Sequence, residues 1–379
     1  MSNGISIPPS HTGTPENCST AAHGKRNSSV ELFRIIATLF VVIVHFNGWF
    51  VGGVPARFDI HDNSEFRIGQ IIIQALTTCC VNCFLIISGW YGIKIKPKTI
   101  WNINWLLLCV YVPFYIVQCF YTKEFSICSL ATRFSGILLE SYFIQCYLML
   151  MFLSPILNSF IEKYGRKILP YVLCFWGIEF VAEIIGNESL GIDGGYSLIH
   201  FILVYLLART ASFYKEELLN IKRIFWVTGY FICGLIICGQ YIWGIRWTWN
   251  YSNPAVLLSA FCLFFPFLYK NYYNKYINAI SSSTFAVFVM HTYSPLVDLL
   301  RSVDRYLLDN TAYLLYLLSV CGIVSVVFCG CIVYDKIRIC VTGKISDKIY
   351  SGIHSVIGNK WLNDICRDVG IACREKRTE

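Results

Sequence analysis

Two ionisable side chains, Arg34 and His45, lie eleven residues apart in the first long apolar stretch of the sequence. On an α-helix that spacing leaves them about 20° apart around the axis and about 16 Å apart along it. One helix face would then carry a fixed cation and, deeper in, an imidazole, which is the natural general base near neutral pH. An arginine alone at a helix end usually anchors the helix at the lipid headgroups, and a histidine alone often hydrogen-bonds to another helix. The presence of both on one helix face is therefore what indicates a catalytic site.

Ionisable groups also occur in later apolar stretches, where their cost in lipid makes them candidates for a site or for pairing with one another. Glu179 and Glu183 share one helix face. They are expected to pair with a cation, to form a proton path or to be satisfied within a bundle. His200 is expected in packing or in acceptor contact. His291 is compatible both with lining a site and with packing between helices.

The elements that must position these groups are helices that cross a membrane. The sequence is 56% hydrophobic and 14% charged, whereas soluble domains average about 25% charged residues. Its apolar runs of roughly 18–23 residues can span a hydrocarbon core of about 30 Å. Lipid offers the backbone no hydrogen-bond partners, and the runs show no polar alternation, so each run is predicted to be a helix. The predicted fold class is all-α, a polytopic transmembrane bundle.

About ten spans are predicted, and the order of charges sets their direction. The spans are residues 30–51, 67–91, 99–121, 136–158, 168–186, 196–214, 223–244, 254–270, 277–299 and 312–334. With the N-terminus inside, 22 of the 31 Lys and Arg residues fall in inner segments and 7 in outer loops, which favours two cytoplasmic termini. The predicted parts are a disordered cytoplasmic N-tail (1–29), a ten-helix transmembrane domain (30–334) and a basic cytoplasmic C-tail (335–379).

Charge and cysteine content exclude other classes. The formal net charge of +8 follows from lysines and arginines held on the cytoplasmic side, so no nucleic-acid partner is predicted. Most of the 18 cysteines lie in apolar runs, where small thiols pack as hydrophobes, and no metal site is predicted. The aromatic residues of segment 243–251 are interpreted as anchors at the membrane interface, with a platform for sugars as the alternative.

Five motifs occur in an order that resembles the acyltransferase-3 family of membrane acyltransferases. They are the Arg34–His45 pair and the segments 82–90 (NCFLIISGW), 142–158 (YFIQ to LSPILN), 194–209 (GGYS to YLLAR) and 281–291 (SSSTFAVFVMH). The segment 194–209 is similar in particular to the bacterial polysaccharide O-acetyltransferase branch. The resemblance covers about residues 28 to 334. It departs from the family where lysines stand for an arginine-rich motif after the second span, and where His200 replaces a common aromatic residue.

The resemblance implies an integral-membrane O-acyltransferase of the cell membrane, in the bacterial inner membrane. Such enzymes pass an acyl group, usually acetyl, from cytoplasmic acyl-CoA to a hydroxyl of an envelope or capsular polysaccharide or of its lipid-linked precursor. Acetyl-CoA or another acyl-CoA is then the expected co-substrate. The sugar acceptor and membrane lipids are the other expected partners, and no metal is expected. The acceptor sugar, the acyl group and the oligomeric state are left open.

The resemblance also implies roles for single residues. His45 is expected to act as general base, with Arg34 beside it in the catalytic set; a covalent acyl-histidine intermediate is the open alternative. The groups expected to hold the CoA phosphates are basic: Arg34, Lys94, Lys96, Lys98 and Arg209. The groups expected to orient the imidazole, stabilise the oxyanion or contact the substrate are Asn47, Ser88, Tyr142 and His291.

A transporter or glycan flippase is the main alternative function, because helical bundles with internal charges fit that class too. The sequence shows no repeated halves and no pair of broken helices in corresponding positions, which counts against it. A receptor or sensor is a third class, and it is disfavoured because no soluble signalling domain is attached.

Overall fold

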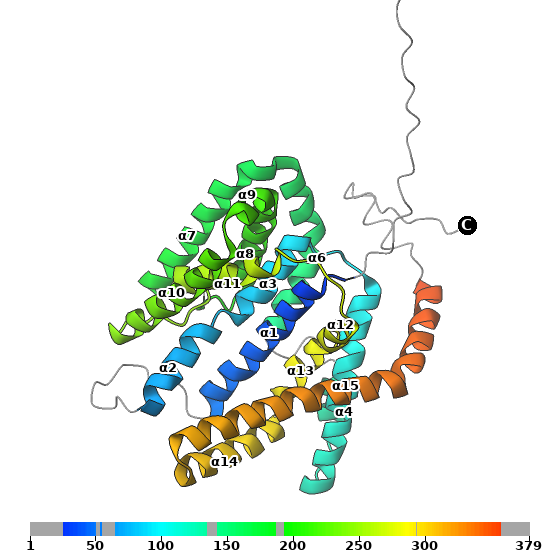
Figure 1. Ribbon diagram of the computed structural model, residues 1–379. Helices are drawn as coiled ribbons and strands as arrows, with labels where there is room; N and C mark the ends of the chain where they lie inside the picture. The colour runs from blue at the N-terminus through cyan, green and yellow to red at the C-terminus, as the bar shows by residue number, and fades with distance from the viewer. Residues whose placement is uncertain are drawn as a thin grey trace, which may run out of the picture.

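The structure, a computed structural model, describes residues 26–50, 54, 65–134, 142–186, 193–292 and 294–357. Every regular element in these residues is helical, which confirms the predicted all-α class. Figure 1 shows long tilted helices side by side with shorter pieces between them. Most of the predicted N-tail (1–25) and the end of the predicted C-tail (358–379) lie outside the described residues.

Helix α1 (Ser28–His45) lies at the centre of the bundle. Its start is capped by Asn27, whose side chain accepts a hydrogen bond from the N–H of Ser29 at 3.0 Å, the usual role of an N-cap residue. The helix packs against α3, α12 and α13 and runs unbroken to His45. Beyond His45 the chain widens into a π-helical turn, η1 (Phe46–Phe50).

Helix α3 (Cys80–Tyr91) makes its most extensive contact with α8 (Leu198–Ala211). A Cβ on Gly89 would lie 2.4 Å from the carbonyl oxygen of Tyr205. Only glycine therefore lets the two backbones approach this closely, as at other close helix contacts in membranes. Helix α2 (Glu65–Thr77) ends just before α3, so the predicted span 67–91 consists of two helices.

The other helices of the middle of the chain surround this centre. They are α4 (Pro97–Thr122), α5 (Ile127–Phe134), α6 (Tyr142–Tyr164), α7 (Leu169–Ile185), α9 (Lys215–Asn220), α10 (Arg223–Ile242) and α11 (Pro254–Phe264), with the 3-10 turns η3 (Gly165–Ile168), η5 (Ser212–Tyr214) and η6 (Phe265–Phe267). The predicted span 136–158 is seen from Tyr142 onward, because residues 135–141 lie outside the described residues.

The predicted ninth span, 277–299, is divided among three helices. They are α12 (Lys275–Ser281), α13 (Thr284–His291) and the beginning of α14 (Ser294–Asn310). Between the first two, the Ser282 and Thr284 hydroxyls donate to the carbonyls of Ala279 and Ser281, and such local bonding competes with regular helix. Helix α15 (Tyr313–Ile357) continues past residue 334, where the C-tail was predicted to begin.

Seven helical stretches of the described residues are long and apolar enough to cross a membrane. The number differs from ten for physical reasons. Helices α6 and α7, joined by η3, form one stretch from Tyr142 to Ile185, and α11, α12 and α13 are each shorter than a full span. The count of about ten spans and the cytoplasmic placement of both termini stay predictions.

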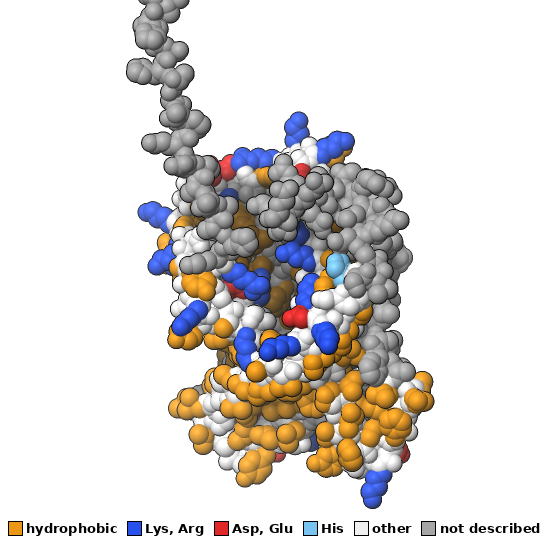
Figure 2. Space-filling view, turned by 90° about the vertical axis from the view of Figure 1, so that its right-hand side faces the viewer, with side chains coloured by type: hydrophobic (Ala, Val, Ile, Leu, Met, Phe, Trp, Pro, Cys, Tyr) orange, Lys and Arg blue, Asp and Glu red, His pale blue; other side chains and the backbone are white. Residues whose placement is uncertain are grey.

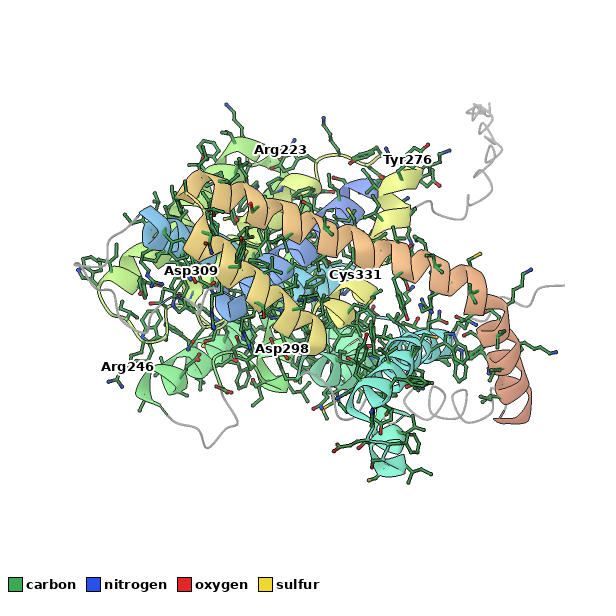
Figure 3. All side chains as sticks on the ribbon, turned by 90° about the horizontal axis from the view of Figure 1, so that it is seen from below. Arg223, Arg246, Tyr276, Asp298, Asp309 and Cys331 are labelled. Atoms are coloured by element: carbon green, nitrogen blue, oxygen red, sulfur yellow. The ribbon has the colours of Figure 1, made fainter. Side chains whose placement is uncertain are left out.

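The outer surface carries apolar side chains that a soluble protein would bury. Leu235 on α10 and Val326 on α15 are both 72% exposed. Figure 2 shows an apolar surface over the lower part of one face and, above it, Lys and Arg side chains around a hollow. In Figure 3, Arg223 and Tyr276, from predicted inner segments, lie along one edge, and Arg246, from a predicted outer loop, lies apart from them. This surface is the one expected of a multi-pass membrane protein.

Candidate functional site

Two histidines from distant parts of the chain meet where α1 and α13 end. Nδ1 of His45 lies 2.8 Å from Nε2 of His291. The two rings are nearly parallel, with an angle of 20° between their planes. His291 is buried. The structure thus joins the residue predicted as general base to the histidine whose role the sequence left open between site and packing.

Hydrogen bonding assigns the protons of this pair. Nδ1 of His291 lies 2.7 Å from the carbonyl oxygen of Val287. A carbonyl only accepts, so this nitrogen carries the hydrogen, and a neutral His291 accepts at Nε2. His45 must then donate from Nδ1, which leaves the lone pair of its imidazole on Nε2. The partner therefore fixes the tautomer of His45 and leaves Nε2 as the ring nitrogen that carries no hydrogen.

A narrow cavity of about 180 Å³ lies between α1, α3, α4, α6 and α13. Arg34 and Thr38 line it on α1, and Phe288 lines it on α13. The ring of Phe288 meets that of His291 edge-on, with 6.1 Å between centroids. The other lining residues are mostly apolar: Phe84, Ile87, Ser88, Ile103, Phe143, Ile144, Tyr147, Leu148, Thr284 and Phe285. Neither histidine lines the cavity, and Phe288 is the lining residue that connects it to His291.

Arg34 is held by a carboxylate that the sequence analysis did not single out. Its guanidinium forms an ion pair with Glu31, one turn earlier on α1. Glu31 is buried and also accepts a hydrogen bond from the hydroxyl of Ser281 on α12. The i,i+3 spacing of Glu31 and Arg34 was the available indication. The pair orients the cation at the cavity and ties α12 to α1.

The other basic residues predicted to hold phosphates do not line the cavity. Lys98 forms an ion pair with Asp347, and its Nζ lies 4.5 Å from the ring centroid of Tyr350. Arg209 donates to the carbonyl of Trp90 at 3.3 Å. Lys94 and Lys96 are exposed on the segment before α4. Arg34 is thus the predicted phosphate-binding residue that lines the cavity.

Asn47, Ser88 and Tyr142 were predicted to orient the imidazole or stabilise the oxyanion. Among these three, only Ser88 lines the cavity. Its hydroxyl lies 3.2 Å from that of Tyr147. Asn47 turns toward α2, where its side chain donates to Gln74 at 2.9 Å. Tyr142 packs edge-on to Tyr196, with 4.7 Å between ring centroids. The described contacts of Asn47 and Tyr142 thus lead away from the imidazole.

The other ionisable groups that the sequence placed within apolar stretches connect helices. His200 is fully buried and pairs with Glu179 at 3.2 Å and with the Asn82 side chain at 2.9 Å. These contacts link α8, α7 and α3. Glu183 accepts from Ser252 and Asn250 in the segment before α11. The contacts of Glu183 fit the satisfied-bundle alternative, whereas Oε1 of Glu179 is buried and has no hydrogen-bond partner among the described residues. Within the described residues, no group of three His, Cys, Asp or Glu side chains could hold a metal ion.

Comparison with known proteins places these residues in a family. A family model described as an acyltransferase domain, of the acyltransferase-3 type, matches residues 27–335. The match covers most of the chain, including both histidines and every residue that lines the cavity. The comparison with curated proteins found no match, and neither did the comparison with solved structures.

Proposed function

Because the chain belongs to the acyltransferase-3 family, we propose that it is a membrane O-acyltransferase that uses acyl-CoA and has His45 as its general base. The proposed acceptor is a hydroxyl of an envelope or capsular polysaccharide, or of its lipid-linked precursor. The motifs that resemble the polysaccharide O-acetyltransferase branch support that acceptor class and favour acetyl as the acyl group. The proposed location is the bacterial inner membrane.

The observation that carries the proposal is the histidine pair, in which His291 contacts Phe288, one of the residues that line the cavity. In the proposed step, Nε2 of His45 takes the proton of the acceptor hydroxyl as its oxygen bonds to the thioester carbonyl carbon. The carbon–sulfur bond then breaks, and the imidazolium returns the proton to the leaving thiolate. The products are the ester and CoA. His291 holds the reacting tautomer through the hydrogen bond to Nδ1. Attack by Nε2 on the thioester itself, which gives an acyl-histidine, is the alternative route.

The cavity supports the approach of the acyl donor from one side. Arg34 lines the cavity. Eleven residues separate it from His45 on the unbroken helix α1, a distance of about 16 Å along the axis, which is comparable to the reach of a phosphopantetheine arm. The apolar lining suits the arm and a short acyl group, whereas the hydroxyls of Thr38 and Thr284 suit its amides. Arg34 would face the pyrophosphate end, and Lys94, Lys96, Lys98 and Arg209 would complete the binding of the nucleotide outside the cavity.

The test is mass spectrometry of envelope glycans from cells with the wild-type protein, without it, and with His45→Ala. We expect acyl groups only with the wild-type protein. His354→Ala is the matched control, because His354 stacks on Tyr350 far along α15 and should leave the acyl groups in place. An acyl pattern that does not depend on the protein would contradict the acceptor class. Full acylation by an inserted His45→Ala protein would contradict the mechanism.

A further inference from the structure

A buried set of amide side chains joins the π-helical turn after His45 to helix α2. Asn47 lies in this turn, two residues beyond His45, and Gln70 and Gln74 lie one turn apart on α2. Asn47 and Gln70 are 7% and 3% exposed. The amides lie beside the proposed general base, because Asn47 belongs to the turn that follows His45. We call Asn47, Gln70 and Gln74 the amide clamp.

The clamp residues bond to one another and to Arg67 and Thr78 beside them. The side-chain amide of Asn47 donates to Oε1 of Gln74 at 2.9 Å and to the backbone carbonyl of Gln70 at 3.2 Å. Gln70 returns a bond from Nε2 to the backbone carbonyl of Asn47 at 3.4 Å. Arg67 donates to Oε1 of Gln70 at 2.5 Å, and Gln74 donates to the hydroxyl of Thr78 at 3.4 Å. Amides that satisfy one another in this way fix a geometry rather than offer an open binding site.

The clamp fixes the backbone directly after His45, because it joins the π-helical turn to α2. π-Helical turns occur frequently at functional sites, where they set a local backbone shape that regular helix does not provide. Here the turn begins at the residue after His45, so its position sets that of the imidazole relative to His291. Helix α2 is separated from α3 at Thr78 and Cys79, and the clamp specifies its register against the turn.

On these grounds we propose that Asn47, Gln70 and Gln74 are positioning residues, which hold His45 in hydrogen-bonding distance of His291 by clamping the π-helical turn to α2. The inference rests on the proposed function, adds Gln70 and Gln74 to its machinery and explains how Asn47 acts on the imidazole without contacting it. None of the three needs to touch substrate. A displacement of about 1 Å at a reacting group can cost about 100-fold in rate, so loosening the turn should slow the transfer step without weakening acyl-CoA binding.

The test compares purified Asn47→Leu and Gln74→Met proteins with wild type in lipid vesicles, with kcat and the KM for acyl-CoA and for acceptor measured separately. We expect kcat to fall about 10- to 100-fold and both KM values to stay within about twofold. Gln240→Met is the matched control, because it removes a comparable amide bond, 2.7 Å to Asn253 on the α10–α11 connection, and should leave kcat unchanged. Gln74→Glu keeps an oxygen acceptor for Asn47 and should keep kcat within a few-fold of wild type.

A second readout separates positioning from general loss of structure. In a His291→Ala background the imidazole has already lost its partner, so Asn47→Leu should cost only a few-fold more, a clear departure from additivity. Equal losses in both backgrounds, a folded Gln74→Glu as slow as Gln74→Met, or unchanged kcat in Asn47→Leu would each overturn the inference. A rise in acceptor KM alone would overturn it in favour of an acceptor site. Failure of the proposed function gives a different result, because His45→Ala would then keep the wild-type rate of acyl transfer whatever the clamp variants do.

Discussion

The proposed general base, His45, is held in one tautomer by His291, a residue 246 positions away in the chain. A lone imidazole in a membrane helix can adopt either tautomer, and only one presents a lone pair where a substrate can use it. Two successive hydrogen bonds, from His45 to His291 and from His291 to the carbonyl of Val287, select the His45 tautomer whose Nε2 carries no hydrogen. The arrangement resembles in logic a catalytic base held by a second polar group.

His291→Ala should therefore slow acyl transfer by about 100-fold, within the range that general-base catalysis contributes, with little change in the KM for acyl-CoA. His291→Gln retains a side-chain oxygen that can accept from Nδ1 of His45 and should recover part of the rate. Steady-state kinetics of the purified proteins check this. Wild-type kcat in a folded His291→Ala protein would show that the pair serves packing only.

The Glu31–Arg34 pair leads to a prediction about stability. Breaking a buried ion pair costs 3–5 kcal/mol in typical cases, but the side chain of Arg34 is 32% exposed. Solvent screening reduces the cost, so Glu31→Gln should lose about 1–2 kcal/mol of unfolding free energy. Glu162→Gln is the control, since Glu162 is an exposed partner 3.8 Å from Arg209 and should change stability by less than about 0.5 kcal/mol. Equal thermal midpoints for the two variants would contradict the assignment.

At the scale of elements, the contact of α3 with α8 depends on a missing side chain. A Cβ at Gly89 would press on the backbone of Tyr205 and lie 2.7 Å from Cβ of Ala208. The helices would have to separate, and α3 carries Ser88 and Ile87 into the cavity wall.

Gly89→Ala should thus lower the unfolding free energy by about 1–3 kcal/mol, as overpacking does in cores, and reduce acyl transfer along with it. Gly177→Ala on α7 is the matched substitution, because no atom lies within 4 Å of the added Cβ and alanine favours helix. Thermal unfolding in detergent measures both. A Gly89→Ala protein as stable as Gly177→Ala would show that α3 and α8 are not in close contact.

The elements also show what sequence can and cannot predict. Helix α1 and the shared face of Arg34 and His45 follow from hydrophobic length and helix geometry. The breaks near Thr78 and between Ser281 and Thr284 were missed, because an apolar run looks the same whether one helix or two cover it. The contacts of His45 with His291 and of Glu31 with Ser281 depend on which helices pack together, and spacing along one helix does not encode that.

The whole molecule places a mostly apolar cavity inside a helical bundle whose outer surface exposes many apolar side chains. Figure 2 shows Lys and Arg side chains around a hollow on the face where α4, α12 and the end of α15 lie. An acyl-CoA has matching halves, because its nucleotide carries phosphates and its arm and acyl group are narrow. This arrangement supports the proposed use of acyl-CoA, with its nucleotide bound at the basic hollow.

Binding of that substrate should stabilise the folded protein. A ligand at 100 times its Kd adds about 2.7 kcal/mol to the unfolding free energy, so saturating acetyl-CoA should raise the thermal midpoint by several degrees. Ser88→Phe, which fills part of the cavity, should remove most of this shift. A transporter or flippase for glycans would show no specific shift with CoA thioesters, and that outcome would favour the alternative function.

We propose above all that His45 is the general base for acyl transfer from acyl-CoA. Purified protein in lipid vesicles, given acyl-labelled acetyl-CoA and an extract of lipid-linked glycans, tests it by the label that appears in the glycan. We predict transfer by the wild-type protein and a loss of at least about 100-fold in His45→Ala, with the variant still folded and still stabilised by acetyl-CoA. Transfer at the wild-type rate by His45→Ala would contradict the account.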